Sequence, residues 1–262
     1  MLDTLAVTLV QYAPQWEDVQ FNLSHLNNMI EPLAGKSNLI VLPEMFATGF
    51  SMNTNKICGQ ATTVLQWMQR LSQTTGAIVA GSIAVLDGHN FNRFYWVMPD
   101  CSLGYYDKRH LFTMSDEPQH FAVGTQQKLF EWHGWNIKPI VCYDLRFPAW
   151  CRNNLTKPYD LLICSASWPS VRFDVWLTLL KARAIENQCY VVGVNRTGTD
   201  GKGIQYKGDS VIYSPKGETI GILSENEEVA ITFELSLSAL HDFRKKFPVL
   251  NDMDNISFGE GV

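Results

Sequence analysis

Apolar and polar residues follow one another along the chain with two different periods. Runs that are apolar throughout, or that alternate with polar residues, predict β-strands at 5–12, 38–42, 77–83, 92–97, 103–106, 136–141, 160–164, 190–195, 209–213, 219–223 and 228–234. Apolar residues spaced three and four apart predict helices at 18–33, 62–75, 172–187 and 238–246. Strands and helices thus alternate before a final run of strands, which is typical of α/β layers over a mixed sheet or a pair of sheets. No repeat, low-complexity tract or linker interrupts the pattern, so we expect residues 1–262 to form a single domain.

Composition narrows the class of protein. The chain is 46% hydrophobic and 18% charged, as in a globular protein rather than a disordered one. A net charge of -5 argues against a nucleic-acid partner or an anionic membrane surface. No apolar run approaches the roughly 20 residues of a spanning helix. The first positive charge is Lys36, so the cationic start of a signal peptide is absent and we expect a cytoplasmic protein.

Cysteine and glycine spacing gives no support for a bound metal or cofactor. The six cysteines are widely spread, which favours free thiols in a reducing compartment. The chain has no C-x-x-C, H-x-H or H-E-x-x-H spacing for zinc. It also lacks the glycine-rich phosphate-binding motifs G-x-G-x-x-G and G-x-x-x-x-G-K-[ST]. The glycine-rich stretch 198–203 is interpreted as a loop tip. We therefore expect no metal and no cofactor.

Three reactive side chains stand at or just past the ends of predicted strands, where open α/β folds usually place their chemistry. They are the thiol of Cys142, the carboxylate of Glu44 and the ammonium group of Lys108. A free thiol titrates near ~8.5, so a nucleophilic cysteine needs a nearby base or cation. Glu44 could take the thiol proton, while Lys108 and the backbone N–H of Tyr143 could stabilise an oxyanion. The set fits acyl transfer from an amide through a thioester on Cys142.

Each of these residues also has an ordinary structural interpretation. A cysteine at a strand end is commonly a small buried hydrophobe, a glutamate after proline can cap a turn, and a lysine can be a surface charge. His110 is a competing partner for Cys142, as in cysteine peptidases, although no orienting Asn or Asp can be assigned to it by spacing.

Three segments, in order along the chain, resemble the signature blocks of the nitrilase superfamily, also called carbon–nitrogen hydrolases. They are Leu-Pro-Glu at 42–44, Tyr-Asp-Lys-Arg-His-Leu-Phe at 106–112 and Val-Cys-Tyr-Asp-Leu-Arg-Phe-Pro at 141–148. Within the superfamily the chain is most similar to ω-amidases, which hydrolyse the terminal amide of 2-oxoglutaramate and similar short dicarboxylic monoamides. The segments that carry this closer similarity are 43–50, 181–188 and 246–248.

The resemblance implies an αββα sandwich, with Glu44 as base, Lys108 as oxyanion stabiliser and Cys142 as nucleophile. Many relatives use a further glutamate, for which Glu117 is the matching candidate. It would orient the amide or assist proton transfer, unless it is only a loop carboxylate. Asp116 is adjacent to it and easily confused with it. Family members commonly dimerise through helices, so the resemblance also implies a homodimer, although the apolar stripe of the 176–187 helix is equally explained by a monomer core.

The substrate would be a small amide, and a substrate carboxylate needs a cation besides Lys108. Trp168 and Arg172, and Phe50 as an apolar wall, are the candidate binding residues. Arg146 suits a bidentate clamp, but an ion pair with Asp144 is at least as good an interpretation. Two rival functions stay open. One is hydrolysis of another carbon–nitrogen substrate, such as a nitrile, an N-carbamoyl amino acid or an aliphatic amide. The other is a binding module that keeps the fold without turnover.

Overall fold

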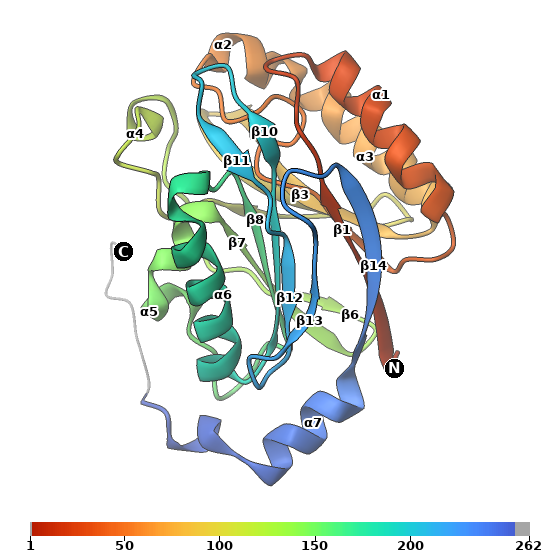
Figure 1. The fold of residues 1–262 in the computed structure, drawn as a ribbon, viewed down its shortest axis with the longest axis vertical. Helices are drawn as coiled ribbons and strands as arrows, with labels where there is room; N and C mark the ends of the chain where they lie inside the picture. Colours follow the sequence, from red (N-terminus) through yellow and green to blue (C-terminus); the bar gives the residue numbers. More distant parts are fainter. Residues whose placement is uncertain (1, 255–262) are drawn as a thin grey trace.

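The structure is a computed structural model and describes residues 2–254. Two six-stranded sheets stack face to face, and helices cover their outer sides (Figure 1). This is the expected αββα sandwich. None of the helices in the described residues combines the length and apolar character needed to cross a membrane.

The first sheet has a parallel centre and antiparallel edges. Its strands, in spatial order, are β14 (Val229–Ser236), β1 (Thr4–Gln11), β2 (Leu39–Val41), β3 (Ile78–Asp87), β4 (His89–Val97) and β5 (Leu103–Asp107). β2 lies parallel to both β1 and β3, while β14, β4 and β5 pair antiparallel with their neighbours. The short, fully buried β2 is typical of a strand covered on both faces.

The second sheet repeats this plan. Its strands, in spatial order, are β13 (Thr219–Ile222), β12 (Val211–Tyr213), β9 (Tyr190–Asn195), β8 (Leu161–Ala166), β7 (Trp135–Val141) and β6 (Phe130–Trp132). β7, β8 and β9 are parallel. The carboxyl ends of β7 and β8 therefore lie at one edge of this sheet.

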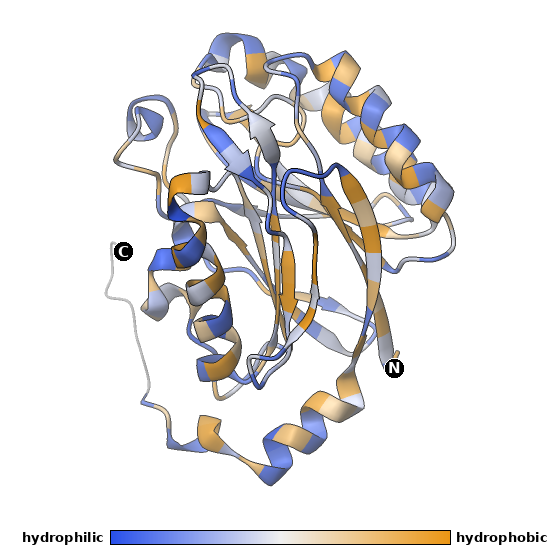
Figure 2. Ribbon diagram, in the orientation of Figure 1, coloured by the Kyte–Doolittle hydropathy of each residue, from blue (hydrophilic) through white to orange (hydrophobic). Residues whose placement is uncertain are grey.

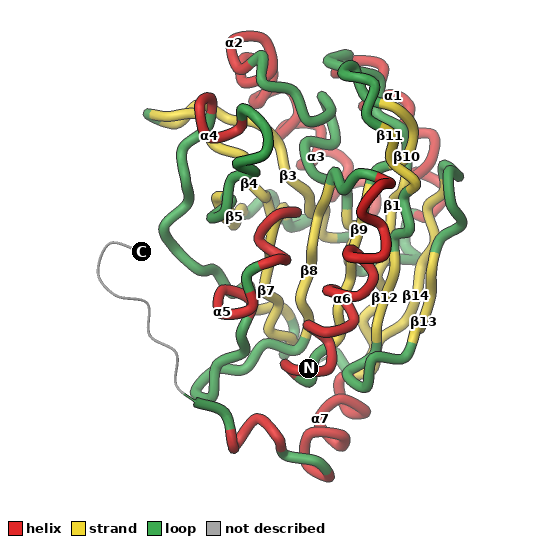
Figure 3. Tube along the Cα trace, turned by 60° about the vertical axis from the view of Figure 1, so that its left-hand side comes forward, coloured by secondary structure: helices red, strands yellow, loops and turns green. Residues whose placement is uncertain are grey.

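The longest helices bury one face each against the sheets. The α-helices are α1 (Val19–Ile30), α2 (Thr54–Ile57), α3 (Ala61–Thr75), α4 (Glu117–His120), α5 (Pro148–Cys151), α6 (Phe173–Asn187) and α7 (Leu237–Lys246). α1 and α3 pack on the outer face of the first sheet, and α6 lies across the second, in front of β8 and β9 in Figure 3. Figure 2 shows apolar and hydrophilic residues side by side on these helices, as expected when one face is buried.

The alternation along β4 shows how the two cores are divided. Phe94 and Trp96 belong to the core between the sheets, while Tyr95 and Val97 belong to the core under α1 and α3. Asn92 has the same parity as Phe94 and so points between the sheets, at the point where the apolar core ends.

Most predicted elements are confirmed. The predicted 62–75 helix corresponds to α3, which ends at Gly76 in the left-handed conformation, with a φ of 70°. The apolar stripe of α6 packs on its own sheet, through Trp176 and Leu180 against Gly193. A homodimer stays a prediction. The prediction of a simple loop tip at 198–203 was wrong in part, because the loop joins a small antiparallel hairpin, β10 (Thr197–Thr199) and β11 (Gln205–Lys207).

Candidate active site

The site lies between the carboxyl ends of strands from both sheets. Glu44 comes shortly after β2 of the first sheet, and Cys142 directly after β7 of the second. Several hydrogen bonds join the sheets at this point. Among them, Ser165 Oγ donates to Leu42 O at 2.8 Å, and Ser167 N donates to Glu44 Oε2 at 2.9 Å. The sandwich therefore fixes the carboxylate of one sheet beside the thiol of the other.

Cys142 sits on a strained turn. It is the first residue of a 3-10 turn, Cys142–Arg146, and has a φ of 45°, which is uncommon for a residue other than glycine. The turn is held by the buried carboxylate of Asp144, which accepts from Val141 N at 3.0 Å and from His110 N at 2.8 Å. Cys142 Sγ in turn lies 3.8 Å from Ser167 O. The conformation of Cys142 is thus set by contacts on both sides of its sulfur atom.

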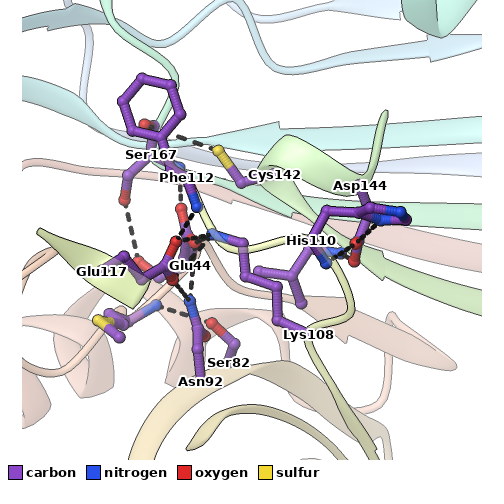
Figure 4. A network of polar contacts seen from close by, with 12 residues as sticks. Glu44, Ser82, Asn92, Lys108, His110, Phe112, Glu117, Cys142, Asp144 and Ser167 are labelled. Atoms are coloured by element: carbon purple, nitrogen blue, oxygen red, sulfur yellow. Dashed lines mark hydrogen bonds and ion pairs between the residues drawn. The ribbon is translucent and has the colours of Figure 1, made fainter. Parts of the chain in front are cut away.

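A buried ammonium group connects two carboxylates (Figure 4). Lys108 Nζ lies 2.8 Å from Glu44 Oε1, and 3.0 and 2.9 Å from the two oxygens of Glu117. All three side chains are at most 1% exposed. One positive charge therefore faces two negative ones where little solvent screens them when no water or ligand occupies the cavity.

Glu117, and not Asp116, belongs to this cluster. Glu117 is fully buried and accepts Phe112 N at 2.6 Å, whereas Asp116 is exposed at the start of α4. The structure thus brings together the four side chains that the sequence singled out, because Glu44, Lys108 and Cys142 line one cavity and Glu117 is hydrogen-bonded to Lys108.

Burial and charge set the protonation states. Burial opposes the charged form of Lys108, but Glu117 and Glu44 outweigh it and raise the pKa of the ammonium group, which stays charged. Burial also raises the pKa of Glu117, although Lys108 opposes this shift. Burial, and then the charge of Glu44, raise the pKa of Cys142 well above its usual range. The resting cysteine is therefore a thiol that must lose its proton before it can attack a carbonyl.

Two residues that sequence reasoning missed complete the cluster. Ser167, just after β8, donates its N–H to Glu44 and offers its carbonyl to Cys142. Asn92 Nδ2 lies 2.8 Å from Glu44 Oε1 and 3.1 Å from Glu117 Oε1. A usable signal was present for Asn92, since this polar residue shares one face of a predicted strand with the apolar Phe94 and Trp96.

A cavity of about 700 Å³, counting its open mouth, leads from the surface to Cys142. The candidate binding residues Phe50, Trp168 and Arg172 all line it, and Phe50 also lies under Lys108, with Nζ 5.2 Å from the ring centre. Arg146 and Lys202 line it too. Lys202 comes from the β10–β11 loop, so this segment forms part of the cavity wall.

Two suggested pairings are wrong. Arg146 does not pair with Asp144; its guanidinium lies over the Trp168 ring, 5.1 Å from the ring centre. His110 does not pair with Cys142. Its Nδ1 lies 2.8 Å from Asp144 Oδ1, and its ring stacks on Phe147 with centres 3.7 Å apart. Within residues 2–254 no group of three or more His, Cys, Asp or Glu side chains could hold a metal ion.

Comparison with known proteins places this geometry in context. The family model described as carbon-nitrogen hydrolase matches residues 6–245. Omega-amidase YafV of Escherichia coli K12 is 44% identical over 251 residues, which cover 95% of this chain and 97% of that protein. A 2-oxoglutaramate amidase of Bacillus subtilis is 32% identical, over 94% of this chain and 96% of that protein.

Solved structures of similar proteins have the same fold as this chain. A CN-hydrolase superfamily protein from Xanthomonas campestris, which carries an arsenic adduct in its active site, has a TM-score of 0.95. It is 40% identical, and the match covers 99% of this chain and 100% of that one. Nit3 of Saccharomyces cerevisiae, a member of the nitrilase superfamily, has a TM-score of 0.86 at 24% identity over 94% of this chain and 95% of that one, a likeness of fold.

Proposed function

This chain belongs to the carbon–nitrogen hydrolase family. It is a hydrolase of carbon–nitrogen bonds other than peptide bonds, and we propose that it is an ω-amidase. It would release ammonia from the terminal carboxamide of a short dicarboxylic monoamide such as 2-oxoglutaramate or succinamate. The observation that carries the proposal is the position of Cys142 beside Glu44 and Lys108, at the floor of a cavity with cationic side chains in its wall. The names of the similar Escherichia coli and Bacillus subtilis proteins support it.

Catalysis would begin with transfer of the Cys142 proton to Glu44. The thiolate attacks the amide carbon, and Lys108 Nζ together with the backbone N–H of Tyr143 stabilises the oxyanion. Glu44 returns the proton to the leaving nitrogen, so that ammonia departs and a thioester remains on Cys142. Glu44 then takes a proton from water, whose oxygen attacks the thioester. The C–S bond breaks, the dicarboxylic acid is released, and Glu44 returns its proton to the Cys142 thiolate. Glu117 would keep Lys108 in place throughout.

The electrostatics of the site favour this order of events. Because burial and the Glu44 charge raise the pKa of Cys142, the resting thiol keeps its proton and is protected from adventitious reaction. Proton transfer to Glu44 becomes productive when an amide carbonyl is next to Lys108, since the ammonium group then stabilises the new negative charge on oxygen.

The cavity wall suits a carboxylate at the far end of the substrate. Arg146, Arg172 and Lys202 line the cavity, and within the described residues none of them forms an ion pair with a carboxylate. Asp200 also lines it, but its oxygens already accept Lys202 N and Tyr206 OH, each at 2.9 Å. The lining holds the four cations Lys108, Arg146, Arg172 and Lys202 against the two carboxylates Glu44 and Asp200, so a negatively charged substrate group would meet a net positive charge.

Ammonia release from a panel of substrates tests the proposal. The panel contains 2-oxoglutaramate, succinamate, an N-carbamoyl amino acid, an aliphatic amide without a carboxylate, and a nitrile. We expect the two ω-amides to have the highest kcat/KM. Faster turnover of the carbamoyl compound, the plain amide or the nitrile would replace the ω-amidase proposal with another carbon–nitrogen hydrolase activity.

A binding module without turnover is the second candidate, and thiol reactivity separates it from an enzyme. We expect iodoacetamide to modify Cys142 with a rate that depends on Glu44, and to modify the half-exposed Cys101 independently of it. Equal behaviour of the two cysteines, with no ammonia from any substrate, would favour the binding module.

A further inference from the structure

Asn92 occupies a position where an apolar residue would complete the core. It lies on β4, pairs with Ala84 of β3, and is fully buried. The next two inward residues of the strand, Phe94 and Trp96, fill the space between the sheets. A buried carboxamide costs free energy unless it is hydrogen-bonded. Its presence therefore needs an explanation in the contacts it makes.

Those contacts are with both carboxylates of the site. Nδ2 donates one hydrogen to Glu44 Oε1 at 2.8 Å and the other to Glu117 Oε1 at 3.1 Å. Both oxygens also accept from Lys108. Asn92 Oδ1 has no hydrogen-bond partner within the described residues. Ionised carboxylates only accept, so the carboxamide presents its two donors to them and leaves its acceptor unused.

Charge balance explains why such donors matter. Lys108 supplies one positive charge, whereas Glu44 and Glu117 supply two negative ones when both are ionised. Among the described residues, the charged groups that face Asn92 are these three, from the loop after β2, the loop after β5 and α4, and Cys142 lies near Glu44. Two buried carboxylates around one ammonium group tend to share a proton, because like charges disfavour double ionisation. A proton held by the pair would leave Glu44 unable to receive one from Cys142.

We propose that Asn92 is a positioning residue that keeps Glu44 and Glu117 ionised and aligned on Lys108, so that Glu44 is ready to accept the Cys142 proton. The inference rests on the proposed function and extends it. Donors to the charged form of an acid lower its affinity for protons, and Asn92 donates to both acids at once. Lys108 N also donates a backbone hydrogen bond to Asn92 O at 2.9 Å, which fixes the position of Lys108 relative to β4.

The test compares Asn92→Leu with wild type across pH. Leucine fills a similar volume, excludes water and donates nothing, so the carboxylate pair should hold its proton to higher pH. We expect the acidic limb of kcat/KM for ω-amide hydrolysis to move up by about 1 pH unit, which corresponds to a tenfold change in proton affinity. At neutral pH this shift should lower kcat by up to about 10-fold, with KM changed less than threefold.

Two further variants separate a positioning role from a packing role. Phe94→Leu disturbs the same strand face without touching a carboxylate, and we expect it to lower Tm while leaving the pH profile in place. Asn92→Ala admits water, which can donate to both acids, so its shift should have the same direction as that of Asn92→Leu and be smaller. An unchanged acidic limb in both Asn92 variants, with activity lost only in proportion to folded protein, would overturn the proposal.

A second readout needs no substrate. The rate of Cys142 alkylation by iodoacetamide, followed by mass spectrometry of the modified peptide, should have an acidic inflection set by the carboxylate pair. Asn92→Leu should raise that inflection by about 1 pH unit. If the wild type hydrolyses none of the amides but the inflection still moves, the ω-amidase proposal fails and the role of Asn92 stands. An inflection that does not move would contradict the proposed positioning role of Asn92.

Discussion

Glu117→Gln isolates the role of the second carboxylate. In wild type each Glu117 oxygen accepts two donors: Oε1 accepts Asn92 Nδ2 and Lys108 Nζ, and Oε2 accepts Phe112 N and Lys108 Nζ. A glutamine has one oxygen and one NH₂ group. In either orientation, its NH₂ therefore faces two donors, and two of the four contacts become repulsive.

The expected stability change is the difference between two larger effects. Two lost hydrogen bonds to a charged group cost about 3–6 kcal/mol. The variant, however, no longer buries a surplus negative charge, which relieves a penalty of several kcal/mol. We expect a net loss of about 0–3 kcal/mol, and a Tm lowered by no more than about 10 °C. The effect on catalysis should be larger. Without the Glu117 carboxylate, Lys108 Nζ would move toward Glu44 and no longer donate to the oxyanion, which should lower kcat by about 10²–10³-fold.

The assay pairs ammonia release with thermal unfolding. Asp116→Asn is the matched control, because Asp116 is adjacent, carries the same charge and is exposed. It should keep wild-type activity and Tm. Glu117→Gln with more than one tenth of wild-type kcat/KM, or with an activity loss that follows its unfolded fraction, would refute the reasoning.

Three other variants test separate parts of the account. Lys108→Met leaves two buried carboxylates without a counter-charge, so unfolding should become easier by about 3–5 kcal/mol and turnover should be lost; an unchanged denaturation midpoint would contradict this. Glu44→Gln should abolish ammonia release and yet lower the pKa of Cys142, because the charge of Glu44 is, next to burial, the main cause that raises this pKa. The alkaline inflection in the rate of Cys142 alkylation should therefore move to lower pH. An inflection that stays in place or moves to higher pH would contradict this expectation. Burial lowers the pKa of Lys138 to about 8, so between about pH 8 and the ordinary lysine pKa of about 10.4 the unfolded chain binds more protons than the folded one. Over that range the free energy of unfolding of wild type should rise by about 2–3 kcal/mol relative to that of Lys138→Met. A difference between the two proteins that stays constant with pH would refute this expectation.

Local patterns predict most of the layers because each element carries its own signal. The three- and four-residue spacing of α1 and α3 and the fully apolar β2 reflect burial that a short window of sequence records. The hairpin β10–β11 left no such signal. Thr197–Thr199 and Gln205–Lys207 are short and mostly polar, and they are held by long-range contacts such as Thr197 N with Tyr12 O at 3.0 Å.

The site shows the same division. Glu44, Lys108 and Cys142 stand at strand ends and inside recognisable blocks, so the sequence reveals them. Asn92 and Ser167 both contact Glu44 from positions far along the chain. Strand order within the first sheet brings Asn92 to Glu44, and packing of the second sheet on the first brings Ser167 to it. The mistaken pairing of Arg146 with Asp144 has the same cause, because sequence proximity favoured it while the fold supplied Asp144 with other donors.

The central claim is a cysteine-dependent hydrolysis of ω-amides, and one measurement tests it most directly. Ammonia release from 2-oxoglutaramate is measured for wild type and for Cys142→Ala, both with a chelator present. We predict turnover by wild type and none above background for the variant, with Tm nearly unchanged. Turnover that survives in Cys142→Ala would contradict the role of the thiol, and a wild type that releases no ammonia would contradict the ω-amidase proposal.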